Sequence, residues 1–241
     1  MGTIAKLTES AMSNANARRP SIHGVLTMLA LSAILAGCGN SSGGNESTKI
    51  NGSIHVAAGK TASAVTTVNG SIHVDDNGAV TSAATVNGSI HLGDRATAGS
   101  LTSVNGAIDI GKGARVTGSA SSVNGELTLK DDAEVAGSLA NVNGRIALAA
   151  AHVGGGIKTV NGSMELAGAS HVEGGILVQK PSGQLLQTLH NVPRIVIGPG
   201  TVVQGDLRFE RTVTLYVSDK ATIGAVTGAT PLPFSGDTAP E

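Results

Sequence analysis

The sequence predicts an all-β chain that winds into a parallel β-solenoid, also called a single-stranded parallel β-helix. An aliphatic residue followed by Asn-Gly recurs seven times between residues 50 and 162, at intervals of 18 or 19 residues. Aromatic residues make up 1% of the chain, Trp is absent, and Gly occurs 34 times. A short fixed period indicates stacked copies of one structural unit. The composition indicates an interior of aliphatic side chains joined by many tight turns.

Residues 1–37 predict a secretory signal peptide of the lipoprotein kind. Basic residues precede an apolar run from Val25 to Ala36, which is too short to span a membrane comfortably. The run ends in Leu35-Ala36-Gly37-Cys38, which resembles the bacterial lipobox. That resemblance implies that Cys38 is lipidated, with palmitate among its acyl chains, and becomes the new amino terminus. Cys38 is the one Cys of the chain, so it cannot form an internal disulfide.

The segment 38–49 combines the lipidated Cys with a tether rich in Gly, Ser and Asn, which predicts a flexible link. Gly39 follows Cys38, and by resemblance to Gram-negative sorting rules this favours the outer membrane. From Cys38 onward the chain carries 13 Lys and Arg against 16 Asp and Glu, a net charge of −3. This balance and the envelope location argue against nucleic-acid binding. The expected partners are the membrane, through the lipid anchor, and a second copy or another envelope component.

Residues 50–178 are predicted to form the repeat solenoid. In the stretch Val68–Val74, we expect Val68, Ile72 and Val74 to share a buried face, because the alternation has the period of a half-buried strand. A second alternating stretch, Ala133–Leu139, indicates at least two short strands per repeat. One coil per repeat would stack equivalent residues about 4.8 Å apart.

Two alternatives concern the turns and the hand of the coil. Asn-Gly is the strongest signal for a two-residue hairpin, but a period of 18 residues rather than about 10 favours the solenoid. Aliphatic residues six positions apart would suit a left-handed coil. Ile72, Ile90 and Ile108 stand where that class prefers a small residue, so we expect a right-handed coil.

Two columns of outward side chains follow from the repeat. We expect a structural ladder in which stacked amides hydrogen-bond along the rod; its members are Asn51, Asn69, Asn87, Asn105, Asn124, Asn143 and Asn161. A second column contains His55, His73 and His91, a weak candidate for a transition-metal site. The repeat supplies no clear fourth ligand there, so a solvated column is favoured and no metal or cofactor is expected.

The repeat pattern breaks after Val178. Residues 179–194 are expected to be an insertion loop, residues 195–229 carboxy-terminal coils with a cap, and residues 230–241 a tail. The aromatic residues Phe209, Tyr216 and Phe234 lie in this part, and they suit a cap because an open last coil exposes apolar core and unpaired backbone. No comparable cap is evident at the amino-terminal end of the repeat.

The repeat motifs V-N-G-x-I-x-V and A-x-V-x-G-x-L, the latter at residues 133–139, resemble two families. One is the bactofilins, polymer-forming bacterial proteins with a right-handed β-helix, and the other comprises exported adhesin-like β-solenoids of unknown function. The resemblance covers about residues 50–178. It implies a solenoid fold and a structural, adhesive or self-assembling role. The lipobox and the expected cap set this chain apart from the bactofilins.

Catalytic motifs do not emerge from the sequence. Charges alternate in sign from repeat to repeat, and residues 50–241 contain no G-x-S-x-G, no H-E-x-x-H, no P-loop and no calcium-binding nonapeptide. We therefore expect a membrane-anchored envelope lipoprotein with a structural or interaction role and no catalysis. The alternatives are a bactofilin-like self-assembling scaffold and a glycan-binding or glycan-processing β-helix.

Overall fold

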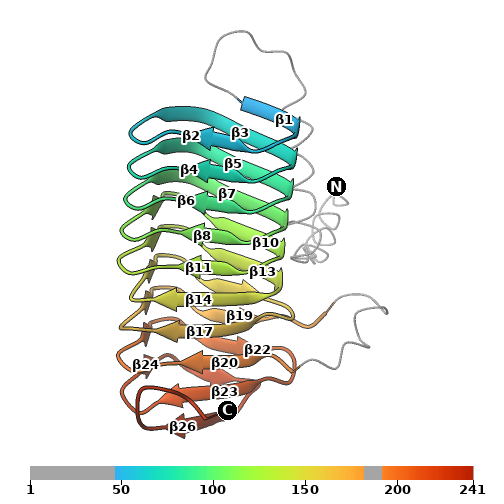
Figure 1. Cartoon of the computed structure of the whole chain (residues 1–241). Coiled ribbons are helices and arrows are strands. Elements are labelled where there is room, and N and C mark those ends of the chain that lie inside the picture. Colours follow the sequence, from blue (N-terminus) through green and yellow to red (C-terminus); the bar gives the residue numbers. More distant parts are fainter. Residues whose placement is uncertain (1–46, 182–191, 241) are drawn as a thin grey trace, which may run out of the picture.

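The computed structural model describes residues 47–181 and 192–240, and every regular element within them is a β-strand. The strands pair in parallel and stack in successive coils, from the first coil in blue to the last in red (Figure 1). Ladder partners in the repeat are 18 residues apart, as in Asn69 and Asn87, or 19 apart, as in Asn105 and Asn124. The predicted all-β parallel solenoid with 18–19 residues per coil is therefore confirmed.

A ten-stranded sheet runs the full length of the stack (Figure 1). Its strands in order are β2 (Ile54–Val56), β4 (Ile72–Val74), β6 (Ile90–Leu92), β8 (Ile108–Ile110), β11 (Leu127–Leu129), β14 (Arg145–Ala149), β17 (Ser163–Ala167), β20 (Arg194–Ile197), β23 (Thr214–Ser218) and β26 (Pro231–Phe234). At the usual spacing of neighbouring strands, the first and last of them lie about 43 Å apart.

A sixteen-stranded sheet forms the rest of each coil. Near the amino-terminal end it consists of β1 (Ser47–Asn51), β3 (Thr61–Asn69), β5 (Ala79–Asn87) and β7 (Thr97–Asn105). Beyond β7 it divides into two rows. The first row is β9 (Arg115–Val116), β12 (Glu134–Val135), β15 (His152–Val153), β18 (His171–Val172), β21 (Val202–Val203) and β24 (Thr222–Ile223). The second row is β10 (Ala120–Asn124), β13 (Leu139–Asn143), β16 (Ile157–Thr159), β19 (Ile176–Val178), β22 (Leu207–Phe209) and β25 (Val226–Thr227).

One apolar core extends along the axis of the coils. Apart from Met164 and Phe209, its large members are aliphatic, and the inward residues of neighbouring coils, such as Ile72, Ile90 and Ile108, are completely buried. In the second alternating stretch, Val135 of β12 and Leu139 of β13 point inward, as their alternation predicts. Because each repeat coil contributes the same small set of side chains, consecutive layers of the repeat pack alike without large aromatic rings.

Val68 does not share the buried face with Ile72 and Val74, so this sequence expectation is wrong. Strand β3 ends at Asn69, and Gly70 turns the chain into β4. The alternation of faces is interrupted at that corner. As a result Thr67 is fully buried, whereas Val68 is only partly buried.

The carboxy-terminal end of the solenoid is formed by β26, which pairs with β23. This strand falls within residues 230–241, the segment expected to be a tail, so the coils extend beyond residue 229. Phe209 and Phe234 are buried, whereas Tyr216 lies on the outer surface with the Arg194 guanidinium 5.1 Å from its ring centre. The predicted signal peptide, Cys38, the predicted tether to residue 46 and residues 182–191 of the predicted insertion lie outside the described residues.

Candidate functional site

The seven repeat asparagines hydrogen-bond one another along the rod. In each case the side-chain Nδ2 donates to the Oδ1 of the Asn one coil earlier, at 3.1 Å for Asn69 to Asn51 and 2.9 Å for Asn161 to Asn143. The donors of the intervening bonds are Asn87, Asn105, Asn124 and Asn143. Because these amides bind one another, the ladder ties each coil to the next.

A second polar column lies inside the same corner, and the sequence reasoning missed it. The hydroxyl groups of Thr67 and Thr85 donate to the carbonyl oxygens of Gly52 and Gly70, at 3.1 and 3.0 Å. Ser103, Ser122 and Asn141 make the equivalent bonds to the glycines of later corners. The available signal was a Thr, Ser or Asn directly before each valine of the repeat. These side chains satisfy carbonyl groups that the turn leaves free of the strand ladders.

The Asn ladder ends against Arg211. In the coil that follows Asn161, Val178 pairs with Thr159, so Lys180 occupies the position where the repeat would place the next Asn. The Arg211 Nη1 donates instead to the Val160 carbonyl oxygen at 3.0 Å and to the Asn161 Oδ1. Burial lowers the pKa of the Arg211 guanidinium. A long cationic side chain thus closes the ladder where the insertion interrupts it.

The predicted histidine column lies in register on the outer face of β2, β4 and β6. The ring centres of His73 and His91 are 6.1 Å apart and the rings are tilted. The His55 Nε2 lies 3.0 Å from the Asp75 Oδ2. In the next coil the column continues as Asp109. These side chains form an outward-facing polar row along the rod, in which His55 and His73 are exposed and His91 and Asp109 are half-buried.

Within residues 47–181 and 192–240, a different group brings three possible metal ligands together. It consists of His152, His171 and Glu173, whose ligand atoms all lie within 4.8 Å of one another. The sequence reasoning did not identify it, although one signal was present. Two His-Val pairs are 19 residues apart, the length of one coil, and Glu173 follows the second pair directly.

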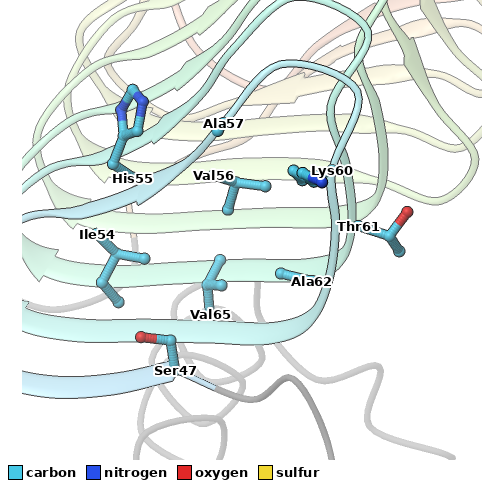
Figure 2. A pocket seen from close by; sticks show the side chains of 9 residues that line it. All are labelled: Ser47, Ile54, His55, Val56, Ala57, Lys60, Thr61, Ala62 and Val65. Atoms are coloured by element: carbon cyan, nitrogen blue, oxygen red, sulfur yellow. The ribbon is translucent and has the colours of Figure 1, made fainter.

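The first coil carries an open cavity of about 400 Å³ (Figure 2). Strand β1 pairs with residues Val65–Asn69 of β3. Ile54 and Val56 from β2 and Val65 from β3 line the cavity, as Figure 2 shows.

Comparison of the chain with protein-family models, with curated proteins and with solved structures finds no match. The resemblance of the repeat motifs to bactofilins and to adhesin-like solenoids stays a prediction. In the part of the chain that the structure describes, no helix has the length and apolar character needed to cross a membrane.

Proposed function

We propose that this protein is a lipid-anchored envelope protein whose solenoid serves as a rigid structural or interaction rod, with an adhesin-like role and no catalysis. The observation that carries the proposal is the place of the lipobox-like segment relative to the rod. Cys38 precedes Ser47, the first residue of β1, by nine positions. Strand β1 belongs to the first coil, at one end of the stack (Figure 1). An acyl anchor on Cys38 would therefore attach the rod by one end.

The dimensions support this arrangement. A tether of nine residues reaches at most about 30 Å when extended. The rod then carries the last strand, β26, about 43 Å beyond the first coil. Each buried methylene of an acyl chain contributes roughly 0.8 kcal/mol, so two or more chains give stable anchoring where one gives only reversible binding. Gly39 after Cys38 favours the outer membrane of a Gram-negative bacterium.

The two polar columns support the role of a rod. The Asn ladder links seven coils continuously, from Asn51 to Asn161. The inner Thr and Ser column adds a second set of bonds between the same corners. Bonds between successive coils resist bending and separation, because a local distortion must break several of them together.

The anchor is tested with Cys38→Ala in cells grown with labelled palmitate. We expect the wild-type protein to incorporate the label and to fractionate with membranes, and the variant to lose the label. A Ser41→Ala variant, altered within the same tether, should behave as wild type. An unlabelled wild-type protein, or equal labelling of the Cys38→Ala variant, would contradict the proposal.

The open first coil favours a second candidate, a self-assembling scaffold. Its cavity is lined in part by the apolar side chains of Ile54, Val56 and Val65. The opposite end is unsuited to head-to-tail growth. The Asp219 N–H donates to the Phe234 carbonyl oxygen. The backbone polar groups of Leu232 and Phe234 therefore point toward β23, because they alternate in direction along a strand. The backbone positions of Pro231 and Pro233 point toward the free edge. Proline has no N–H to offer a further strand.

Electron microscopy of the purified protein separates the two candidates. Single rods or pairs joined at one end would support the anchored rod, because the proline edge limits growth. Long filaments at micromolar concentration would support the scaffold instead.

A further inference from the structure

We propose that His152, His171 and Glu173 bind a divalent transition-metal ion of the zinc class. Two imidazole nitrogens and one carboxylate oxygen would be the protein ligands, and water would complete the coordination. Sites of this composition are typical for Zn²⁺ and for other first-row ions that favour imidazole. The inference goes beyond the anchored rod of the proposed function and does not depend on the anchor.

Adjacent coils place the two imidazoles side by side. His152 in β15 pairs with His171 in β18, and both side chains point outward. Their ring centres lie 5.4 Å apart in an edge-to-face arrangement. Backbone bonds from His152 N–H to the Ala133 carbonyl and from His171 N–H to the Ala151 carbonyl hold both strands in the stack. Ligands on strands are held more rigidly than ligands on loops.

The carboxylate closes the group from the lower coil. Glu173 lies two residues after His171, and its Oε1 is 3.1 Å from the His152 Nε2 in the coil above. The residue stacked on Glu173 in that upper coil is Gly154, since Val153 pairs with Val172. Gly154 has no side chain, so the Glu173 side chain has room to rise toward His152.

The distances suit a metal after small rotations. Ligands around a tetrahedral Zn²⁺ lie about 3.4 Å from one another, whereas the three ligand atoms lie within 4.8 Å. The side chains of His152 and Glu173 are 40% and 51% exposed, so rotation about their χ angles meets little resistance.

The surroundings supply a further polar group and the necessary charge. The Gln204 side-chain amide contacts the His171 Nε2 at 3.0 Å, and its oxygen and nitrogen positions are interchangeable in such an amide. Gln204 can therefore orient the His171 ring. Glu134, in register with His152, is already paired with Arg115, which leaves Glu173 as the negative charge of the site.

The column of His73 and His91 offers a matched control. These residues also occupy one outward position in adjacent coils, but their ring centres are 6.1 Å apart and neither residue belongs to the three-ligand group. Two stacked imidazoles without a closing carboxylate should bind metal much more weakly.

The test is a Zn²⁺ titration by calorimetry, together with visible absorption of added Co²⁺. The full chain carries Cys38→Ala, so that no thiol competes for metal, and it is purified in detergent without a histidine tag. We expect one equivalent of Zn²⁺ per chain and intense Co²⁺ bands of low coordination number. Glu173→Gln and His171→Ala should each weaken binding by at least about tenfold, since even outer-shell partners contribute that much.

A His73→Ala, His91→Ala double variant should bind as the parent does. Zn²⁺ should also raise the melting temperature of the parent but not of Glu173→Gln, because an ion that binds only the folded state stabilises it. Absence of saturable binding, or equal affinity in the parent and in Glu173→Gln, overturns the proposal. Glu173→Gln is an exposed, nearly isosteric change, so it tests metal binding even if His171→Ala impairs folding.

Discussion

The repeat coils and the carboxy-terminal coils are built from the same parallel strands, but their corners are held differently. In the repeat, each corner is tied to the next by identical side chains, the outer Asn ladder and the inner Thr and Ser column. At the beginning of the insertion, Lys180 stands in the Asn position, and Arg211, one coil beyond Lys180, reaches back to Asn161 instead. A ladder of identical residues continues only while each coil supplies the same residue, and its last member needs a different partner.

The two ends of the rod also differ in whether they keep the residues of the repeat. The first coil is an ordinary repeat coil with an open cavity above β3. The last strand carries Pro231 and Pro233 at its free edge and buries Phe234. Repetition extends a solenoid, whereas stopping it requires residues that the repeat does not contain.

The largest expected loss of stability comes from a substitution that disrupts a repeat corner. A Cβ on Gly88 would lie 2.0 Å from the Gly70 carbonyl oxygen, so Gly88→Ala must push the stacked corners apart. We expect a loss of about 3 kcal/mol or more in the free energy of unfolding, measured by guanidinium denaturation with far-UV circular dichroism. Gly113→Asn is the control. At Gly113 φ is 62°, Asn77 has a φ of 57° at the equivalent position, and the nearest atom lies 3.6 Å away.

The control should lose less than about 1 kcal/mol, because Asn tolerates this left-handed conformation. Equal losses at Gly88 and Gly113 would show that close stacking of the corners does not limit the repeat.

The second effect concerns the junction between the two regions. Arg211→Ala removes a donor from the carbonyl of the buried Val160 and from the Asn161 side chain. We expect a loss of about 2 kcal/mol, with faster amide hydrogen exchange concentrated in the coils around residues 160 and 209. Arg208→Ala, which removes an exposed ion pair to Glu210, should cost no more than about 1 kcal/mol. If both variants lose the same amount, Arg211 does not act as the terminus of the ladder.

The third change should improve the inner column. The Asn141 Oδ1 is buried, and no hydrogen-bond partner for it is found among the described residues, while its Nδ2 donates to Gly125. Thr at this position can keep the bond to the carbonyl and removes the unpaired oxygen, as at Thr85. We expect Asn141→Thr to gain about 1 kcal/mol in thermal and chemical unfolding.

Asn143→Thr, two residues further on, provides the contrast. It interrupts the outer ladder, in which Asn143 both donates to Asn124 and accepts from Asn161. We expect a loss of about 1 kcal/mol, so the two substitutions should have opposite signs. A gain at both positions would refute the distinction between the two columns.

The smallest effect on stability is expected at the last strand. Replacing Pro231 and Pro233 by Thr restores two N–H groups at the free edge and should change the unfolding free energy by less than about 0.5 kcal/mol. Self-association should nevertheless increase, because an exposed edge with donors can pair with another chain. Sedimentation velocity measures this. Leu232→Thr leaves the donors of the free edge unchanged, so this control variant should stay as monodisperse as the parent. Equal self-association of the two variants would argue against an edge-blocking role of Pro231 and Pro233.

Sequence reasoning located the features that repeat. The period, the coil length, the stacked Asn positions and the inward Ile residues all follow from alternation within single strands and from the identity of equivalent residues. It misplaced Val68 and overlooked Thr67, because the corner at Gly70 interrupts the alternation and a local pattern cannot show where the interruption falls. The seven-residue Asn ladder was visible in the sequence, whereas the donor that ends it was not.

The sequence by itself determined that the chain is a parallel solenoid of 18–19-residue coils, because each repeat carries the same strand and turn signals. Only the tertiary structure decided which residues of different coils meet. Arg211 reaches Asn161 across 50 residues, because the pairing of β16, β19 and β22 brings their equivalent corners into register. His152 meets Glu173 across 21 residues because one coil and two further positions separate them on the same outer face. Contacts of this kind depend on how coils stack in register, which local residue preferences do not specify.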